Sequence, residues 1–321
     1  MNVIGVEIGG TKLQVALADA DSLETIVSLR EEIVPANGAA GIQQQLQRMI
    51  RSLQSEHTVA AIGIGFGGPL DATAGVITTS HQVEGWDRFP MVAWCQEQFG
   101  LPAVIRNDCD TAALAEATLG AGQGKESSFY VTIGSGIGGG YVYQGQLMGG
   151  SRPAFAEIGH LRPGVLHSEP GNTVEAESSG FGISNEVRQW IKNIAPEERD
   201  DDCRDLLARC QGDLEKLTTR DIAEAALAGN VICEVVLRDA VETLGWAIAQ
   251  VITLLAPEVV ILGGGVSLIP QKLFRTPLED QIATYVFPPL AGSYQLVPAQ
   301  LGEAVVVQGA LLLAKQFVSQ H

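Results

Sequence analysis

The sequence predicts a protein of the α/β class, with two domains that face each other across a cleft. In its first part, strand-like and helix-like segments alternate, which is the pattern of a mixed sheet covered by helices. A unit of two strands joined by a glycine-rich turn occurs twice, over residues 3–18 and 128–145. The return of this unit at the start of the second half indicates two domains built on the same plan.

The elements of the first half follow from the spacing of apolar residues. After the hairpin at 3–18, apolar residues at helical spacing predict a helix over 41–53. A buried strand over 60–66 leads into the glycine turn 67–71. A helix, a short buried strand and a further helix come next, over 92–99, 102–105 and 111–119.

The second half begins with the hairpin at 128–145 and is mostly helical. A loop-rich stretch over 149–180 is followed mainly by helices. A buried strand at 258–262 ends in a glycine triplet, and an apolar helix over 303–317 closes the chain. This order of elements completes the predicted α/β plan.

The composition excludes several classes of protein. The 321 residues are 46% hydrophobic and carry a net charge of −17, which argues against binding to nucleic acid or to an anionic membrane. The longest apolar helix-like run, 243–257, is too short to span a bilayer, and no basic region of a signal peptide precedes the first strand. Five scattered cysteines without a CxxC spacing indicate reduced thiols. We therefore expect a cytoplasmic protein.

Both glycine turns have the chemistry of a phosphate site. Glycine allows positive φ and leaves room for a phosphate to approach backbone N–H groups. The first turn contains Gly9, Gly10, Thr11 and Lys12, and the second runs over 134–140. A chain with two such turns is expected to hold a polyphosphate from two sides.

The second turn also matches the dinucleotide-binding pattern through Gly134, Gly136 and Gly139. In that pattern the glycines open a helix whose N-terminus holds the pyrophosphate. Here Tyr141-Val142-Tyr143 follows, a strand-like run, so we do not predict a Rossmann site.

Six motifs in order resemble those of the ROK family (repressor, open reading frame, kinase), bacterial sugar kinases and regulators of the actin-like ATPase superfamily. The segments are the first phosphate motif, a sugar-side turn, a catalytic segment, the second phosphate motif, a Glu-x-Gly-His segment and a closing helix with a Gly-Ala step. They lie at 5–12, 65–71, 107–113, 132–140, 157–160 and 302–314.

The resemblance implies two actin-like (ribonuclease H-like) domains around an interdomain cleft. The small domain would comprise 1–110 completed by the helix 303–321, and the large domain 111–302. The implied enzyme uses ATP and Mg²⁺, acts on a small-molecule sugar and forms a homodimer. Because the sequence begins at its phosphate hairpin, we expect the kinase branch of the family, without a DNA-binding segment.

The implied reaction is phosphorylation of a hexose hydroxyl, with the 6-hydroxyl of glucose as the default. Three alternatives remain open: an N-acetylhexosamine kinase, a fructokinase, and a non-catalytic sugar-binding ROK regulator that lacks a DNA-binding domain. Loop shapes that set the choice of sugar are not visible in periodicity.

Asp108 is the residue predicted to carry the chemistry. A carboxylate at the carboxyl end of a strand, beside the Asn107 amide, suits a base that takes the proton of a sugar hydroxyl. The alternative is that Asp108 caps the following helix. We expect Asp110 to be better placed for that cap, which leaves Asp108 available.

The remaining site residues are assigned through the resemblance. Gly68 is expected to let the sugar approach the backbone. Glu157 and Glu175 could otherwise be ordinary helix-start glutamates, and His160 a core histidine. The residues expected to bind sugar are Gly68, Asn107, Asp108, Glu157, His160 and Glu175. Those expected to bind ATP are Gly9, Gly10, Thr11, Lys12, Thr132, Gly134, Gly136, Ile137, Gly138 and Gly264. Glu7 is expected to hold Mg²⁺ through water, the alternative being an ordinary strand residue.

One segment departs from the family pattern. ROK proteins usually carry three zinc-binding cysteines after the Glu-x-Gly-His segment, whereas 167–175 contains no cysteine. His160, His167 and Glu169 have no recognisable ligand spacing. We therefore expect no zinc site.

Overall fold

The computed structural model describes residues 1–80, 83–149, 155–164, 169 and 171–320. The chain forms two compact units, which are described separately. Unit 1 comprises Met1–Tyr130, Gly140–Ala156 and Ala299–His321, and unit 2 comprises Val131–Gly139 and Glu157–Pro298. The domain bounds expected from the sequence stay a prediction.

Unit 1 contains a five-stranded sheet with the order β3-β2-β1-β4-β7. The strands are β1 (Asn2–Ile8), β2 (Lys12–Asp19), β3 (Thr25–Glu32), β4 (Val59–Phe66) and β7 (Ala103–Asn107). The first three strands pair antiparallel, whereas β1, β4 and β7 are parallel. The hairpin and the two buried strands predicted here are confirmed, and β3 is an additional edge strand.

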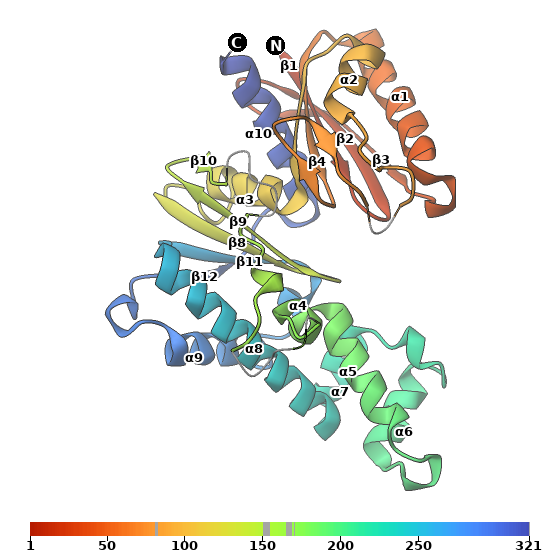
Figure 1. The fold of residues 1–321 in the computed structure, drawn as a ribbon, viewed down its shortest axis with the longest axis vertical. Coiled ribbons are helices and arrows are strands. Elements are labelled where there is room, and N and C mark those ends of the chain that lie inside the picture. Colours follow the sequence, from red (N-terminus) through yellow and green to blue (C-terminus); the bar gives the residue numbers. More distant parts are fainter. Residues whose placement is uncertain (81–82, 150–154, 165–168, 170, 321) are drawn as a thin grey trace. The chain divides into compact units, whose positions relative to one another are not determined.

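The two faces of this sheet are packed differently. Large apolar residues of the strands meet α1 (Gly38–Glu56) and α2 (Met91–Phe99) on one face. Small residues meet α10 (Val305–Gln320) on the other face, so this helix lies close to the strands (Figure 1). A Cβ added to Gly5 would lie 2.6 Å from the carbonyl oxygen of Val307, and one added to Gly63 would overlap the carbonyl of Ala310. These glycines therefore permit the close approach of α10.

α10 also holds α3 (Asp108–Leu119), the helix that begins at the predicted base. A Cβ on Gly309 of α10 would overlap the carbonyl of Thr111, which explains the Gly-Ala step of the closing helix. The fully buried Glu116 accepts hydrogen bonds from the backbone N–H groups of Ala121, Gln300 and Leu301. Because backbone donors fill this carboxylate, the end of α3 and the entry to α10 are fixed together.

The second sheet has the order β10-β9-β8-β11-β12. Its strands are β8 (Ser127–Ile133), β9 (Ile137–Tyr143), β10 (Gln146–Leu147), β11 (Val259–Gly263) and β12 (Gln295–Pro298). The bounds of the two units fall within β8 and β9. A small hairpin of β5 (Leu70–Asp71) and β6 (Val76–Ile77) completes the strands described in unit 1.

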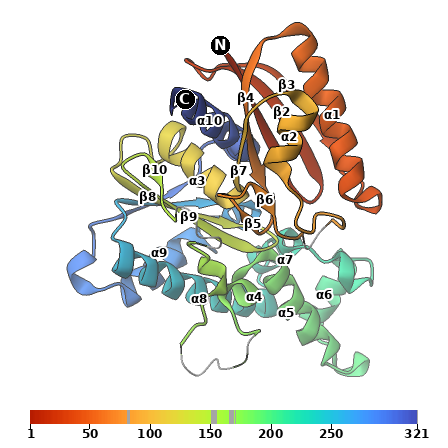
Figure 2. The same cartoon turned by 45° about the horizontal axis from the view of Figure 1, so that its top comes forward.

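Unit 2 is built around α8 (Val231–Leu255), most of whose apolar residues are buried. The other helices are α4 (Val174–Ser178), α5 (Gly180–Lys192), α6 (Asp201–Arg209), α7 (Thr219–Leu227) and α9 (Arg275–Tyr285). Figure 2 shows α4, α5 and α8 side by side. The hydroxyl of Ser178 donates to the carbonyl of Ala240 at 2.7 Å, and that of Thr243 donates to Glu177 at 2.7 Å, so α4 is fixed on α8.

The predicted α/β fold class is confirmed by these two sheets and their helices. Every helix in the described part of the chain is too short or too polar to cross a membrane.

Candidate functional site

In unit 1, two turns and the start of α3 meet at the carboxyl ends of parallel strands. Ile8 of β1 pairs with Phe66 of β4, and Phe66 pairs with Asn107 of β7. The N–H of Gly67 donates to the carbonyl of Ile8 at 2.9 Å, which joins the turn after β4 to the end of β1. Ligands of parallel α/β sheets bind at this edge, so the predicted residues of unit 1 lie where a site is expected.

Asn107 is the N-cap of α3. Its backbone is extended (φ −60°, ψ 152°), and its side-chain oxygen accepts the N–H of Cys109 at 2.8 Å. The prediction that Asp110 caps this helix is wrong, because Asp110 is already the third helical residue and the extended residue before the helix is Asn107. The Asn107 amide nitrogen donates to the carbonyl of Gly68 at 3.3 Å, so the structure brings Gly68, Asn107 and Asp108 together.

Asp108 is the first residue of α3, and its two carboxylate oxygens have different surroundings. Oδ1 accepts the N–H of Cys109 at 2.9 Å. Oδ2 lies near Gly67, where an added Cβ would be 3.3 Å away, so glycine keeps this side open. Burial raises the pKa of Asp108, although the hydrogen bonds to Cys109 oppose this. A carboxylate whose pKa is raised is better matched to proton abstraction.

Glu7 and Lys12 form an ion pair across the first hairpin. The Lys12 ammonium lies 2.8 Å from Oε1 of Glu7 and also donates to the carbonyl of Glu303 at 3.1 Å. Oε2 of Glu7 is buried and has no hydrogen-bond partner among the described residues. Burial raises the pKa of Glu7; Lys12 lowers it, and the charge of Asp108 raises it further. An orphaned carboxylate oxygen fits a Mg²⁺ ion that keeps most of its waters.

The second hairpin is held by groups from elsewhere in unit 2. The N–H of Ile137 donates to Oε2 of Glu175 at 2.7 Å, and the N–H of Gly180 donates to the carbonyl of Gly134 at 2.8 Å. Within the turn, the N–H of Gly134 donates to the carbonyl of Gly136 at 2.9 Å. β9 follows this turn directly, so the prediction of a strand rather than a Rossmann helix is confirmed.

One part of the predicted reason for these glycines, the need for positive φ, is wrong, whereas the room that they leave for a phosphate stays a prediction. Gly9, Gly134 and Gly136 do not adopt positive φ. At Gly136, an added Cβ would lie 2.5 Å from Oε2 of Glu175, so a larger residue there would require this carboxylate to move.

The Glu-x-Gly-His segment packs against the second hairpin. Ile158–His160 form a 3₁₀ turn, and a Cβ on Gly159 would overlap the carbonyl of Ile137. The N–H of Val174 donates to the carbonyl of Leu161 at 2.9 Å, which connects this segment to α4. The His160 side chain is exposed. The structure thus gathers the Glu157–His160 segment, Glu175 and the hairpin in unit 2.

The described residues contain no group of three or more His, Cys, Asp or Glu side chains placed to hold a metal ion. His167 lies outside the described residues. The expected lack of a zinc site stays a prediction.

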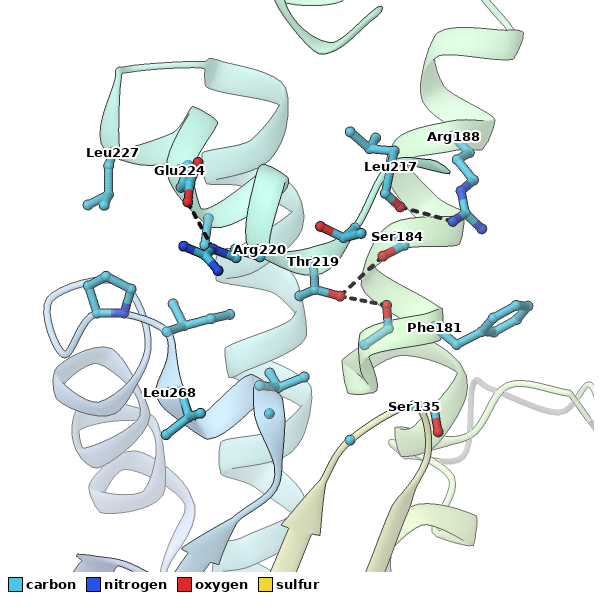
Figure 3. A pocket seen from close by; sticks show the side chains of 18 of the residues that line it. Ser135, Phe181, Ser184, Arg188, Leu217, Thr219, Arg220, Glu224, Leu227 and Leu268 are labelled. Carbon is cyan, nitrogen blue, oxygen red and sulfur yellow. Dashed lines mark hydrogen bonds and ion pairs between the residues drawn. The ribbon is translucent and has the colours of Figure 1, made fainter. Parts of the chain in front are cut away.

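A pocket of about 1070 Å³ opens beside the second hairpin in unit 2. Gly134 and Ser135 line it, together with Gly180 at the N-terminus of α5. Figure 3 shows its walls, which come from α5, α7 and the 3₁₀ turn Gly265–Leu268. Apolar wall residues include Phe181, Leu217, Ala223, Leu227, Val266, Leu268 and Ile269.

Most polar side chains of this pocket bond to neighbouring protein groups. The Thr219 hydroxyl donates to the carbonyl of Gly180 at 2.9 Å and lies 3.1 Å from the Ser184 hydroxyl (Figure 3). Arg188 donates to the carbonyls of Leu214, Glu215 and Leu217, and Arg220 pairs with Glu224. The pocket therefore offers a ligand mainly apolar contact, with the glycine hairpin at one end.

Sequence reasoning missed these pocket walls. Apolar residues on α5 and α7 have the pattern of ordinary core residues, so periodicity does not mark them. Of the residues predicted to bind ATP, Gly134 lines the pocket. Gly264 does not: its φ is +83°, and a Cβ there would overlap the backbone of Ile133. Its neighbour Gly265 lines the pocket.

The chain matches the ROK family over residues 3–317. It is 30% identical to a glucokinase of Halalkalibacterium halodurans, with 98% of this chain and 94% of the relative covered. Among solved structures, it is similar to a ROK hexokinase from Thermus thermophilus (TM-score 0.81, 28% identity, all of both chains covered). It is also similar to a ROK family glucokinase from Streptomyces griseus in complex with glucose and AMPPNP (TM-score 0.77, 28% identity, 98% and 100% covered).

The chain therefore belongs to the ROK family, as the sequence predicts. The similarity to solved ROK structures extends over the whole chain, which confirms the predicted actin-like fold class.

Proposed function

We propose that the protein is an ATP-dependent sugar kinase that transfers a phosphoryl group to the 6-hydroxyl of glucose, with Asp108 as the general base. Membership of the ROK family and the similarity to glucokinases support the class of enzyme. The observation that carries the proposal is the pocket of unit 2, because it joins an apolar chamber to a glycine hairpin.

The apolar chamber suits a nucleoside, and the hairpin suits its phosphates. Gly134 and Ser135 line the pocket at one end, where α5 also begins. The N-terminus of a helix carries a partial positive charge and favours anions. A nucleotide whose base lies among Ala223, Leu227 and Leu268 would therefore direct its phosphates toward the second hairpin.

In unit 1, the first hairpin supplies the cation for phosphate. Lys12 is held close to the turn by Glu7, and backbone N–H groups of Gly10 and Thr11 complete the proposed phosphate contacts. Mg²⁺, when bound with the nucleotide, would neutralise charge on the phosphate oxygens during transfer. Glu7 would hold it through water, because its Oε2 is buried and orphaned.

Asp108 accepts the proton of the attacking sugar hydroxyl on Oδ2, the oxygen beside Gly67. Oδ1 is fixed by the N–H of Cys109, so the carboxylate is oriented before sugar binds. Phosphoryl transfer depends on the orientation of the attacking hydroxyl more than on the strength of the base. A fixed carboxylate can orient this hydroxyl, and its raised pKa helps it to accept the proton.

The proposed sugar contacts come from motifs in unit 1 and from motifs in unit 2. In unit 1, Asn107 and the backbone at Gly68 bind hydroxyls beside Asp108. In unit 2, Glu157, His160 and Glu175 do so, and carboxylates are suited to accept from pairs of hydroxyls. These roles rest on the motifs, as do the proposed homodimer and cytoplasmic location.

A coupled assay of ADP release tests the proposal with Mg²⁺-ATP and a panel of glucose, mannose, fructose, N-acetylglucosamine and N-acetylmannosamine. We expect the highest kcat/KM with glucose and a product phosphorylated on oxygen 6, identified by ³¹P–¹H NMR. A higher kcat/KM with fructose or an N-acetylhexosamine would replace glucose as the substrate. Sugar binding without ADP release would favour a non-catalytic regulator.

A further inference from the structure

We infer that Glu175 is a positioning residue for the second glycine hairpin, and that through this contact it couples sugar binding to nucleotide binding. The inference rests on the proposed function, which assigns a sugar to Glu175 and phosphates to the hairpin. It adds that a hydrogen bond between Glu175 and the hairpin, wholly within unit 2, connects these two proposed binding functions.

The contact is a charge-assisted hydrogen bond. Oε2 of Glu175 accepts the N–H of Ile137 at 2.7 Å, at the point where the turn enters β9. Hydrogen bonds to an ionised acceptor are shorter and stronger than neutral ones. Since this N–H is already taken by a carboxylate, Ile137 shapes the hairpin through its backbone and does not offer that donor to a phosphate.

Gly136 provides independent evidence that the hairpin is built around this carboxylate. A Cβ on Gly136 would lie 2.5 Å from Oε2 and 3.3 Å from Cδ of Glu175. At Gly134, two residues earlier in the same turn, the nearest atom to an added Cβ is 4.0 Å away. The space at residue 136 is therefore occupied by Glu175.

The carboxylate is held on a firmly anchored helix. Thr173 caps α4 by accepting the N–H of Ala176 at 3.2 Å, and Ser178 donates to the carbonyl of Ala240 at 2.7 Å. The N–H of Val174 is bonded to Leu161, just after the Glu-x-Gly-His segment. Glu175 therefore connects that segment and the hairpin through a short path of hydrogen bonds.

The sign of the coupling follows from charge. A carboxylate beside the hairpin fixes its shape but repels a phosphate by Coulomb interaction. A sugar hydroxyl that donates to Glu175 withdraws part of this charge while the bond to Ile137 is kept. Sugar should then raise the affinity for nucleotide, and nucleotide must raise the affinity for sugar by the same factor.

Calorimetric titration of the full chain with Mg²⁺-AMPPNP, with and without saturating glucose, tests this inference. We compare wild type with Glu175→Ala, Glu175→Gln and the matched control Glu177→Gln, which removes a carboxylate charge from the same helix and can still accept from the Thr243 hydroxyl. Without glucose, Glu175→Ala should weaken AMPPNP binding by about tenfold, the size expected for a lost charged hydrogen bond. Glu175→Gln can still accept from Ile137, so its AMPPNP affinity should equal or exceed that of wild type.

The glucose effect separates positioning from a merely structural role. Glucose should tighten AMPPNP binding to wild type and to Glu177→Gln, and should not do so for Glu175→Gln. If Glu175→Ala proves unfolded in a thermal melt, Glu175→Gln alone carries the test. Equal glucose enhancement in Glu175→Gln and wild type would overturn the inference while leaving the kinase proposal intact. Failure of wild type to bind AMPPNP at all would overturn the proposed function, and this inference with it.

Discussion

The two glycine hairpins have similar sequences, but their support is different. The first, between β1 and β2, carries its own charges, because Glu7 and Lys12 lie on its two strands and pair at 2.8 Å. The second, between β8 and β9, has no charged residue over 131–140. It takes its carboxylate from Glu175, which lies 38 residues along the chain from Ile137.

This difference indicates that the two hairpins have different functions. The charges of the first hairpin, with Asp108 near Glu7, concentrate the proposed chemistry in unit 1. The second hairpin has no charges of its own, and its backbone is bonded to a helix that lies far along the chain. Substitutions at the first should alter reaction and charge, and substitutions at the second should alter shape and nucleotide affinity.

The largest expected effect is that of Asp108→Asn, which removes the proposed general base of unit 1. We expect kcat to fall by about 10²–10⁴. Glucose affinity should be nearly kept, since asparagine can still accept from Cys109. Steady-state kinetics and glucose titration measure the two quantities, with Asp110→Asn as the neighbouring control. A near-normal kcat in Asp108→Asn would remove this residue from the mechanism.

Lys12→Met tests whether charge distinguishes the hairpins. The variant loses the ammonium that is proposed to contact the phosphates and leaves the buried Glu7 without its partner. The KM for ATP should rise about 10–100-fold, corresponding to the loss of a charged hydrogen bond. Ser135→Ala in the second hairpin, measured in the same ATP titration, should change KM far less. Equal effects would mean that the two hairpins bind phosphate in the same way.

Gly136→Ala and Gly134→Ala form a matched pair within the second hairpin. The added methyl at residue 136 must displace the Glu175 carboxylate, which breaks its bond to Ile137 and costs about 1.5–3 kcal/mol. At residue 134 the methyl meets open space. We expect a lower free energy of unfolding for Gly136→Ala only, measured in urea. If both variants unfold alike, Glu175 does not define the shape of this turn.

The buried carboxylates of unit 1 should make stability depend on pH. Burial raises the pKa of Asp108, so the folded state binds this proton more tightly than the unfolded state does. Its contribution to stability is full below the unfolded pKa of about 3.9 and is lost as pH rises through the raised pKa. Asp108→Asn should match wild type in acid and become the more stable protein toward neutral pH. Denaturation curves at several pH values measure this difference, and a constant difference would contradict it.

The smallest expected effect concerns the base of the nucleotide. The polar side chains in the pocket walls, including Thr219 and Arg188, are already bonded to protein groups. An apolar pocket discriminates weakly between ligands, whereas a pocket with dedicated hydrogen bonds discriminates strongly. The kcat/KM for GTP should therefore lie within about tenfold of that for ATP. A preference of several thousandfold would show that backbone groups read the base.

Much of the fold could be predicted because its signals are local. The hairpins, the buried strands and the closing helix have apolar spacing that neighbouring residues set among themselves. Asn107 and Asp108 could be selected as candidates for the same reason, since they lie at the end of a predicted strand. The choice of cap between Asn107 and Asp110 was missed, because it depends on which residue leaves the strand with an extended backbone.

The sequence by itself determined the α/β class, the order of the motifs and the family, since each is encoded in contiguous residues. Only the tertiary structure decided that Glu175 supports the second hairpin, that Gly136 makes room for it and that Gly265 rather than Gly264 lines the pocket. It also decided which apolar residues of α5 and α7 form a pocket rather than a core. These features depend on contacts between residues far apart in the chain, and no local pattern of residues encodes such contacts.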